Sequence, residues 1–492
     1  YSMDWKNMQE MPINHTAKIT TWEQLNMIIS YCQNDVSSTK EIMKRSKEQI
    51  LLRRDLSKEY GINLYSASEP KISRELFSYF LSEKLNIPKY ELKQLRTHRQ
   101  TIKISDIILP YTKFKTEGFN RILETFRGIE LDMTTKVKFK YSVNYKGVRT
   151  DFGLGGIHGA KESGIYESSK GMTIMSSDVT SYYPNLAIRN KWAPAHLPKQ
   201  EFCDQYEWFF EERKKIAKKD IKNYVYKIIL NSTFGLSIEP NSFLFDPQFG
   251  MQITINGQLS LCMLYEMLSE GIPGCIPLMQ NTDGLEMLIP NDMRDKYLEI
   301  CKEWETITQL QLEHDQYSKI VLADVNNYIA ISKSGSVKSK GRFEYKDLAL
   351  HKNKSFLIIP KALHAYFVDG VMPEQYLSQN RNIFDYCAGL KGKGDWKFME
   401  TCVVEGQVQR RELQKVIRYY ISNTGCKIVK HNISDGRDIK TEAGEWMQTE
   451  FNKYADKPWA DYQVNDDYYL EKIYQEIANV KPLATNQLDL FA

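Results

Sequence analysis

Two aspartates in separate parts of the chain stand where carboxylates could hold a metal cation. Asp178 comes directly after a short apolar strand and shortly before Pro184. Asp283 lies in a tight turn between two apolar strands, where Gly284 lets the backbone turn sharply. Carboxylate oxygens are the ligands that Mg²⁺ prefers. Either aspartate alone is more typical of an ordinary turn than of a metal site, so the interpretation depends on the segment between them.

That segment predicts a helix with one functional face. Lys227, Asn231 and the pair Phe234 and Gly235 stand at i, i+4 and i+7/i+8, whereas the isoleucines and leucine at 228–230 turn away. The predicted face therefore carries a cation, an amide, an aromatic ring and a glycine gap.

Six cations lie just upstream, between Arg213 and Lys222, with only Asp220 to balance them. If the chain reverses near Asp220, Arg213 and Lys227 would lie at the same height on two antiparallel helices. A polyphosphate could then bind between them. The alternative is a solvated basic helix beside a buried one.

These segments together resemble motifs A, B and C of the family B DNA polymerases. Their order is Asp-x-x-Ser-x-Tyr-Pro from Asp178, Lys-x-x-x-Asn-Ser-x-aromatic-Gly from Lys227, and x-Thr-Asp-Gly ending at Gly284. Three spaced motifs in the right order are far more specific than any one of them. The resemblance covers residues 135–341 most firmly.

The resemblance implies an α+β fold of the right-hand type, with an antiparallel palm sheet, short helical fingers and a mainly helical thumb. Asp178 and Asp283 would bind two Mg²⁺ ions, for which Mn²⁺ could substitute, and the Val179 carbonyl would be a further ligand. One ion would activate the primer 3′-hydroxyl and the other would neutralise charge on the triphosphate.

The resemblance also implies a binding site for deoxynucleoside triphosphates. Tyr183 would lie under the deoxyribose and clash with a 2′-hydroxyl, and Ser181 would hydrogen-bond the triphosphate. Lys227 and Arg213 would hold the phosphates, while Asn231 would steady them or Tyr183. The expected nucleotide-binding residues are Ser181, Tyr182, Tyr183, Arg213, Lys227, Asn231 and Gly235.

Two positions depart from the family pattern. Asn281 stands where the third motif usually begins with aspartate, which should weaken the metal site without abolishing it. Phe234 replaces the usual tyrosine and keeps only the stacking surface. Fewer than fifty residues separate Asp178 from Lys227, so the fingers must be short, which favours a polymerase that extends ordinary primers.

A five-residue match to the third motif of 3′–5′ proofreading exonucleases lies near the beginning of the chain. Tyr31 and Asp35 are expected at the start of a helix, where spacing of i, i+4 puts them on one face. In the family the aspartate binds a metal and the tyrosine orients the attacking water. An ordinary helix start is the alternative. Since no Asp-x-Glu strand precedes it, we expect only the end of an exonuclease domain, without proofreading activity, from a chain that starts inside a longer protein.

Three further elements resemble DNA-contacting parts of the family. Gly155 and Gly156 stand where a Tyr-x-Gly-Gly element touches the template backbone, although the tyrosine is absent. Tyr328 matches part of a Lys-x-Tyr element at the primer end, and Lys338 and Lys340 follow in the passage from palm to thumb. Plain strands and turns remain the alternative for these elements.

The last residues match the peptide Gln-Leu-x-Leu-Phe, by which bacterial polymerases dock on the β sliding clamp. Gln487 would fix the register, while Leu488, Leu490 and Phe491 supply apolar contacts. A frayed tail is the alternative. Tethering to a ring on DNA would raise processivity. Together with short fingers, this peptide suggests a bacteriophage enzyme that works with the clamp of its host, in the bacterial cytoplasm.

Composition places few limits on function. The 66 Lys+Arg against 62 Asp+Glu leave a net charge of +4, which indicates neither a polycation nor an acidic disordered chain. No apolar run approaches the length of a membrane span. The eight cysteines form no Cys-x-x-Cys pair, which argues against a zinc ribbon and against a disulfide framework, and favours a reducing compartment.

The 492 residues predict several domains. We assign an exonuclease remnant to 1–60, a helical connecting region to 61–134, palm to 135–190 and 246–350, fingers to 191–245, thumb to 351–480 and a flexible tail to 481–492. The leading hypothesis is template-directed DNA synthesis. The alternatives are a truncated piece of a polymerase–exonuclease and a clamp-bound scaffold without robust catalysis.

Overall fold

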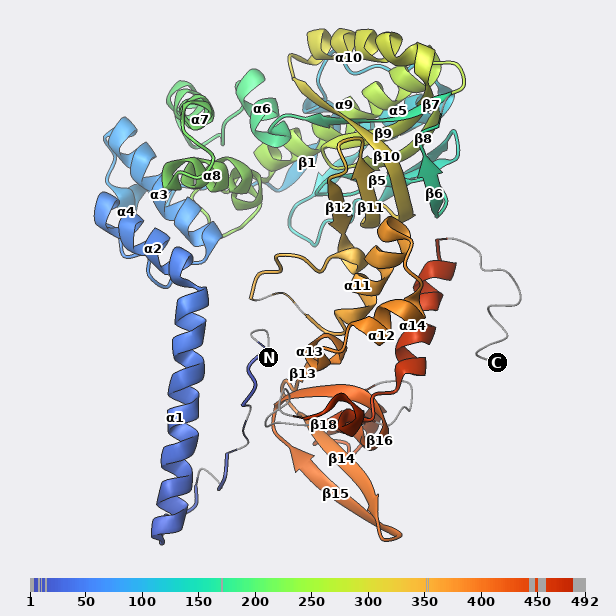
Figure 1. Ribbon diagram of the computed structural model, residues 1–492. Coiled ribbons are helices and arrows are strands. Elements are labelled where there is room, and N and C mark those ends of the chain that lie inside the picture. Colours follow the sequence, from blue (N-terminus) through green and yellow to red (C-terminus); the bar gives the residue numbers. More distant parts are fainter. Residues whose placement is uncertain are drawn as a thin grey trace. The chain divides into compact units, whose positions relative to one another are not determined.

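The computed structural model describes residues 4–7, 9, 11–13, 16–169, 171–350, 352, 354–441, 447–449 and 457–480. The chain forms two compact units. Unit 1 comprises Tyr1–Lys47, Asn326–Ile329 and Lys338–Ala492, and unit 2 comprises Glu48–Val325 and Ala330–Val337. The first boundary therefore falls inside the expected exonuclease remnant. Separate helices and antiparallel sheets confirm the α+β class (Figure 1).

Unit 2 is built on an antiparallel sheet with the strand order β10-β7-β9-β8-β5-β4-β3, and β6 pairs with β10. The strands are β3 (Tyr141–Tyr145), β4 (Val148–Phe152), β5 (Ile157–Ala160), β6 (Gly164–Glu167), β7 (Met172–Val179), β8 (Ile276–Asn281), β9 (Gly284–Pro290) and β10 (Leu312–Asp324). Apolar residues alternate from Val137 to Tyr145, which predicts a hairpin in this region, and β3 and β4 form one. Its two turn residues, Lys146 and Gly147, both have positive φ, which matches the twist of the flanking strands.

A long helix, α9 (Pro247–Gly271), lies at the centre of unit 2, because 20 of its 25 residues are buried. The helix α10 (Arg294–Thr308) packs against it, and the indole of Trp304 donates a hydrogen bond to the Ser260 carbonyl at 2.8 Å. The helix α5 (Glu117–Arg127) packs against β3. In the part of the chain that the structure describes, no helix is both long enough and apolar enough to cross a membrane.

A second helical group in unit 2 contains α6 (Tyr182–Arg189), α7 (Lys199–Lys215) and α8 (Ile221–Ser237). The helices α7 and α8 pack on α3 (Glu69–Leu85), and α6 packs on α7 and α8. Aromatic side chains fill its core, with Phe77 against Phe202, Tyr206 and Phe209. Residues 191–245 are mainly helical, as expected, but a break at residues 216–220 separates α7 from α8. The expected helical connecting region holds α3, α4 (Lys89–Leu92) and α5, together with β1 (Thr101–Lys103) and β2 (Glu130–Asp132).

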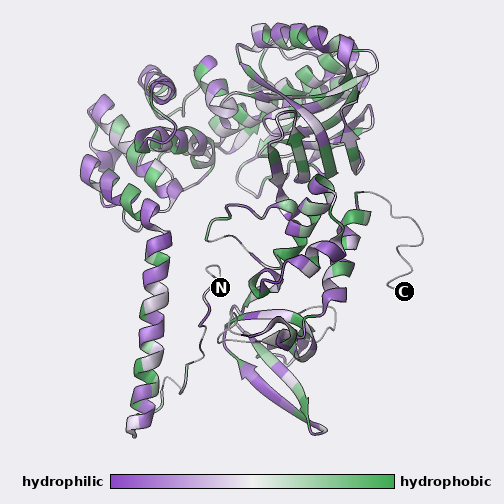
Figure 2. Ribbon diagram, viewed as in Figure 1, coloured by the Kyte–Doolittle hydropathy of each residue, from purple (hydrophilic) through white to green (hydrophobic). Residues whose placement is uncertain are grey.

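The first long helix of the chain is less regular than the sequence indicates. The helical pattern over residues 22–54 divides at Ser46 into α1 (Trp22–Arg45) and α2 (Lys47–Tyr60). No residue of α1 is buried, and Trp22 is 80% exposed. Figure 2 shows polar and apolar residues mixed along its whole length. A helical pattern of apolar residues therefore predicted the element correctly but not a buried face.

The expectation of a mainly helical thumb is wrong for the middle of residues 351–480. Here β-branched and aromatic residues form a sheet of six strands, with β16 at its centre. They are β13 (Ala388–Lys391), β14 (Trp396–Val404), β15 (Gln407–Leu413), β16 (Val416–Asn432), β17 (Asp438–Lys440) and β18 (Met447–Thr449). The helices of this region are α11 (Ile358–His364), α12 (Pro373–Gln379), α13 (Ile383–Tyr386) and α14 (Asp466–Ala478). The chain passes between the units within β11 (Asn327–Ser332) and near the start of β12 (Val337–Lys340).

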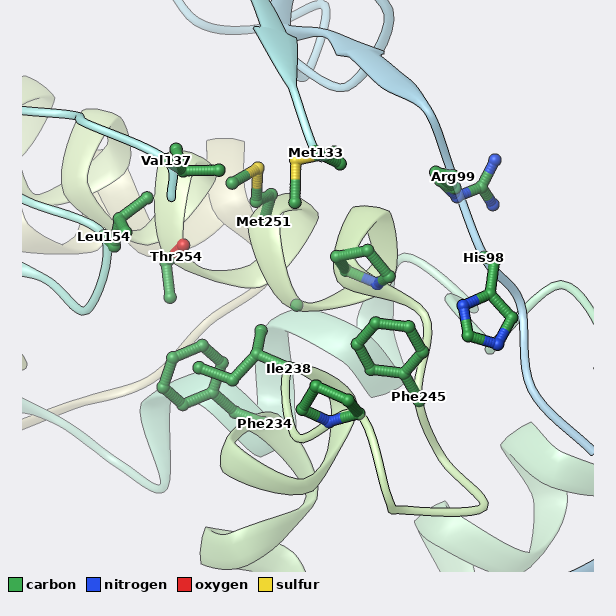
Figure 3. Close-up of a pocket in the computed structure, with 13 residues that line it drawn as sticks. His98, Arg99, Met133, Val137, Leu154, Phe234, Ile238, Phe245, Met251 and Thr254 are labelled. Carbon is green, nitrogen blue, oxygen red and sulfur yellow. The ribbon is translucent and has the colours of Figure 1, made fainter. Parts of the chain in front are cut away.

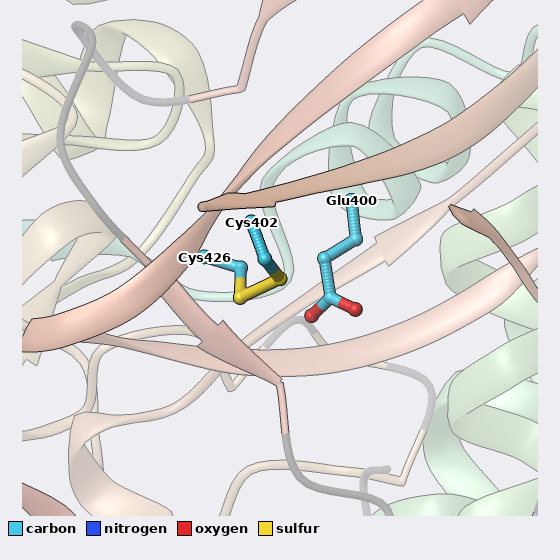
Figure 4. A group of neighbouring side chains, drawn as sticks. All are labelled: Glu400, Cys402 and Cys426. Carbon is cyan, nitrogen blue, oxygen red and sulfur yellow. A yellow bond between two sulfur atoms is a disulfide. The ribbon is translucent and has the colours of Figure 1, made fainter. Parts of the chain in front are cut away.

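One disulfide joins two strands of unit 1, although the cysteine spacing argued against a disulfide framework. The antiparallel register pairs Thr401 with Lys427, so Cys402 and Cys426 face each other across β14 and β16 with 4.8 Å between their Cα atoms (Figure 4). The sequence spacing of 24 residues carried no sign of this pairing, because only the strand register creates it.

Candidate active site

The two aspartates lie at the ends of neighbouring strands in unit 2. Asp178 is the second-last residue of β7 and pairs with Gly284, the first residue of β9. The backbone N–H of Val179 donates a hydrogen bond to the Asp283 carbonyl at 2.7 Å. The first and third motifs are therefore joined through the backbone, so the positions of the two aspartates do not depend on flexible side-chain contacts.

Gly284 makes this close approach possible, for a different reason from the one the sequence suggested. It is absent from the residues with positive φ, so the turn itself does not require glycine. A Cβ atom at this position would instead overlap Oδ1 of Asp178 and come within 2.9 Å of its Cγ. Gly284 is therefore needed to leave room for the carboxylate.

Asn281 and Asp283 occupy different environments. Asn281 is the last residue of β8, pairs with Gly284 and lies across from His158. Thr282 and Asp283 form the two-residue turn, and Asp283 is exposed at its tip. The aspartate that the third motif shares with this chain is therefore the exposed one in the turn, whereas the position that differs, Asn281, belongs to β8.

Strand β7 is also held by side chains that contact Ser177, on the face opposite to Asp178. No sequence motif identifies these residues. The Ser177 hydroxyl lies 2.6 Å from the Tyr297 hydroxyl and 2.8 Å from Nδ1 of His314. Burial raises the pKa of Tyr297 well above its usual value and lowers that of His314. These neutral side chains hold the strand next to Asp178. They come from distant segments, so their roles became visible only in the fold.

Two further carboxylates lie near Asp178. Glu313 of β10 is directly across from it, and Oε1 of Glu313 accepts a hydrogen bond from Thr180 at 3.3 Å. Glu286 of β9 is buried and accepts a hydrogen bond from Ser176 at 3.3 Å. The sequence analysis missed both glutamates, since only the strand register places them beside the aspartates.

The turn after Asp178 exposes backbone N–H groups. Ser181 has a positive φ of 43°, which is uncommon for a residue with a side chain, and α6 begins directly after it. The first N–H groups of a helix have no partners within the helix and favour anions. Those of Tyr182 and Tyr183 are therefore suited to a phosphate group, as expected for this segment.

Tyr183 connects the aspartates, the glycine loop and α8. Its hydroxyl donates a hydrogen bond to the Gly155 carbonyl, and a Cβ atom on Gly156 would lie 3.0 Å from that hydroxyl. Its ring meets the Phe234 ring edge to face, with 5.4 Å between centroids. Burial, followed by the charge of Asp283, raises the pKa of Tyr183. The loop expected to touch template backbone is thus anchored to Tyr183.

Tyr182, by contrast, is directed into the core. Its side chain is buried and its hydroxyl donates a hydrogen bond to the Gly257 carbonyl on α9. Of the two neighbouring tyrosines, only Tyr183 presents its side chain to the site, so Tyr182 can contribute to nucleotide binding through its backbone alone.

The predicted face of α8 is present. Lys227, Asn231 and Gly235 are exposed, whereas Ile229 and Leu230 are buried. Phe234, half-buried between this face and Tyr183, completes the set. The cation, amide, ring and glycine gap therefore lie along one side of the helix, as their spacing indicated.

The expected alignment of Arg213 with Lys227 is wrong by one helical turn. The Asn223 amide donates to the Arg213 carbonyl at 3.0 Å, and Tyr206 donates to the Leu230 carbonyl at 2.8 Å. These two contacts set an antiparallel register in which Arg213 lies opposite Asn223, four residues or about 6 Å along the axis from Lys227. The chain reverses before Asp220, which instead caps α8 by accepting from the Lys222 N–H.

Asp178 and Asp283 carry carboxylate oxygens, the kind of ligand that Mg²⁺ prefers, and the missing side chain of Gly284 leaves room for the Asp178 carboxylate. Among the described residues, a compact three-residue group with metal-ligating atoms is Glu400 with Cys402 and Cys426. Its two sulfurs are bonded to each other and its glutamate pairs with Arg411 at 2.7 Å (Figure 4), so it gives no support to a magnesium site.

Several expected site residues belong to unit 1. Tyr31 and Asp35 lie in the middle of α1 rather than at its start, and burial, followed by the charge of Asp35, raises the pKa of Tyr31. Tyr328 is buried, with the Lys338 ammonium 5.9 Å from its ring centre, while Lys338 and Lys340 are exposed. Tyr328 therefore offers little ring surface to a primer. The peptide Gln487–Phe491 lies outside the described residues.

No protein-family model matches the chain, and no curated protein sequence matches it significantly.

Proposed function

We propose that the chain is a template-directed, DNA-dependent DNA polymerase of the family B type, which extends primer 3′ ends. The observation that carries the proposal is the hydrogen bond from Val179 to the Asp283 carbonyl, together with the pairing of Asp178 and Gly284. It puts two aspartates at adjacent strand ends, next to the N-terminus of α6. Carboxylates beside a phosphate-binding backbone are what nucleotidyl transfer requires.

Asp178 and Asp283 would hold two Mg²⁺ ions, or Mn²⁺ in their place, with the Val179 carbonyl as a further ligand. When bound, the ions supply activation of the primer 3′-hydroxyl and neutralisation of the charge on the leaving pyrophosphate. The chain itself contributes carboxylates at a defined spacing, because Asp178 stands on β7 and Asp283 lies in the turn before β9, and these two strands are hydrogen-bonded to each other.

The substrates would be a deoxynucleoside triphosphate and primer–template DNA. The N–H groups at the start of α6 and the ammonium of Lys227 would bind phosphate oxygens, and Arg213 would bind a phosphate one helical turn away. Tyr183, fixed between Gly155 and Phe234, would lie beneath the sugar and exclude a 2′-hydroxyl.

The wider setting follows from the sequence motifs. We propose a bacteriophage replicase that works in the host cytoplasm and is tethered to the bacterial β clamp by Gln487–Phe491. Deleting these five residues should shorten products only when the clamp is present. Equal product lengths with and without the peptide would contradict the tether. Tyr31 and Asp35 would be the end of an exonuclease site whose other ligands this sequence does not contain.

Primer extension by aspartate variants tests the proposal. Asp178→Asn and Asp283→Asn should each reduce the extension rate by at least about 1,000-fold, because a neutral amide cannot replace a charged ligand of two metal ions. Primer–template affinity, measured by fluorescence anisotropy, should remain close to wild type.

The matched control is Asp292→Asn, since Asp292 is exposed in a short helical turn directly after β9, at the opposite end of this strand from Gly284. It should extend primers at the wild-type rate. Retained synthesis in either the Asp178 or the Asp283 variant would overturn the assignment of the site.

A further inference from the structure

A cavity of about 350 Å³ lies beside Phe234 in unit 2, where α8 ends and α9 begins. Its size falls within the range of about 300–1,000 Å³ typical of small-molecule sites. Figure 3 shows Met133, Val137 and Met251 on one side of it and Phe234, Ile238 and Phe245 on the other. The remaining lining residues are His98, Arg99, Leu154, Pro240, Pro247, Gly250 and Thr254.

The lining of the cavity suits a flat, uncharged heterocycle. None of its 13 lining residues is acidic, and the Thr254 hydroxyl offers a polar group to a ligand edge. Phe234 and Phe245 provide ring surfaces, and the sulfur atoms of Met133 and Met251 are polarizable groups that contact aromatic rings favourably. Nucleobases bind to proteins mainly by stacking on such surfaces.

Cationic residues adjoin the lining of the cavity. Lys136 and Lys138 flank the lining residue Val137 in the sequence, are both exposed, and take part in no ion pair within the described part of the chain. The Arg96 guanidinium donates a 3.0 Å hydrogen bond to the carbonyl of the lining residue Pro240. An apolar interior with cations in the adjoining segments suits a base that is still attached to its phosphates.

The position of the cavity along α8 indicates which strand would use it. Lys227, which would hold the incoming triphosphate, lies 11 residues before Ile238, or about 16 Å along the helix. Phe234 stands between them and contacts Tyr183, which would lie beneath the incoming sugar. In a bound primer–template, the nucleotide beyond the new base pair would be the first unpaired nucleotide of the template strand.

We propose that this cavity binds the first unpaired base of the template strand, directly ahead of the base that is being copied. The base would leave the helical stack and insert between the phenylalanine and methionine side chains, while its flanking phosphates lie near Lys136 and Lys138. This inference rests on the proposed polymerase function and extends it to the path of the template.

The test compares two primer–templates whose template strand extends one nucleotide beyond the templating base. One carries adenine at that position and the other an abasic residue. Stacking of one base on aromatic side chains contributes about 1–3 kcal/mol, so the abasic template should bind the full chain about 5- to 100-fold more weakly by fluorescence anisotropy. Equal affinities would overturn the proposal.

Two variants that fill the cavity distinguish a base bound in the cavity from a base stacked elsewhere on the protein. Ile238→Trp and Leu154→Trp replace exposed residues and should bring the ratio of the two affinities close to one. Ile276→Trp, the same change on an exposed residue at the start of β8, should keep the wild-type ratio. A wild-type ratio in both cavity variants would contradict the proposal.

Extension on a template that ends at the templating base distinguishes this inference from the proposed function. If the wild-type chain extends that primer but shows equal affinities for the two overhangs, only the cavity assignment fails. If it extends no primer on any template, the polymerase proposal itself fails.

Discussion

The strand ends that carry the aspartates and the helical pair α7–α8 position their charged groups in opposite ways. At the strand ends, backbone pairing sets the spacing, with Val179 bonded to the Asp283 carbonyl and Gly284 pressed against Asp178. On α7–α8, the cations stand on long side chains that are exposed, apart from the half-buried Arg213, and some are paired with neighbours on the same helix, such as Lys215 with Glu212.

The difference follows from what each group has to bind. Two metal ions require oxygen ligands at fixed distances, which a backbone ladder provides. A triphosphate is flexible and strongly charged, so cations on movable side chains can adapt to it. The offset of one helical turn between Arg213 and Lys227 is therefore compatible with contacts to different phosphates, whereas a similar offset between the aspartates would disrupt metal binding.

After the aspartate variants, the largest expected effect comes from Gly284→Ala, which adds a single methyl group at the strand ends that carry the aspartates. The added Cβ would displace the Asp178 carboxylate, and a misplacement of about 1 Å can cost about 100-fold in rate. The extension rate at saturating nucleotide should fall by about that factor. Gly171→Ala, directly before β7 and at the opposite end of that strand from Asp178, adds a Cβ that would meet nothing within 4 Å and should have the wild-type rate. A wild-type rate for Gly284→Ala would show that the carboxylate can move freely.

Lys227→Ala tests the helical pair α7–α8 and should lower the affinity for the nucleotide. Loss of a charge-assisted hydrogen bond costs about 1.5–3 kcal/mol, so KM for the nucleotide should rise about 10- to 100-fold in steady-state primer extension. The control Lys215→Ala removes an exposed lysine paired with Glu212 and should change KM less than 2-fold. Similar KM values for both variants would remove Lys227 from the phosphate site.

Tyr183→Ala examines the residue that connects the two regions. Removing the ring opens space beneath the sugar, so discrimination against ribonucleotides should fall about 10-fold or more, as measured by the ratio of kcat/KM values. Tyr183→Phe keeps the ring but loses the hydrogen bond to Gly155, and it should retain discrimination. Unchanged sugar selectivity in the alanine variant would place the selectivity elsewhere.

The smallest expected effect concerns the thermal stability of the protein and its dependence on His196, which lies between α6 and α7. The His196 ring connects two distant segments of the chain. Its Nε2 lies 2.7 Å from the Phe243 carbonyl and its Nδ1 lies 2.8 Å from the Thr97 hydroxyl. A carbonyl only accepts, so Nε2 carries the proton and the neutral ring accepts from Thr97. Burial lowers the pKa of His196.

Because the unfolded chain binds this proton more readily, stability should be full above the usual histidine pKa of about 6.5 and should fall at lower pH. The melting temperature of the wild type should therefore drop about 1–2 °C more than that of His196→Gln between pH 7.5 and pH 5.5. Parallel pH profiles for the two proteins would contradict this role for His196.

Much of the site could be predicted from the sequence where the chemistry lies in local spacing. The face of Lys227, Asn231 and Gly235 depends only on helical periodicity, and the hairpin at β3–β4 only on alternation and a glycine turn. The alignment of Arg213 could not be predicted, because it depends on where the chain reverses. Glu313 and Glu286 were missed because antiparallel register, rather than spacing, places them near Asp178.

Local sequence patterns also gave wrong predictions where long-range contacts determine the structure. The thumb was expected to be mainly helical, yet β16 runs through residues whose pairing with β14 and β13 makes a sheet. The same pairing creates the disulfide of Cys402 with Cys426. In α1, a helical pattern was correct but gave no information about burial.

The sequence by itself determined which groups are available for chemistry: two aspartates at strand ends, a helix with a cation and an amide on one face, and a proline-limited turn between them. These features depend on residues close together in the chain. Only the tertiary structure decided that Gly284 makes room for Asp178, that Tyr183 rather than Tyr182 faces the site, and that a cavity opens beside Phe234. The physical reason is that steric exclusion, strand register and cavities arise between segments that meet only when the chain folds.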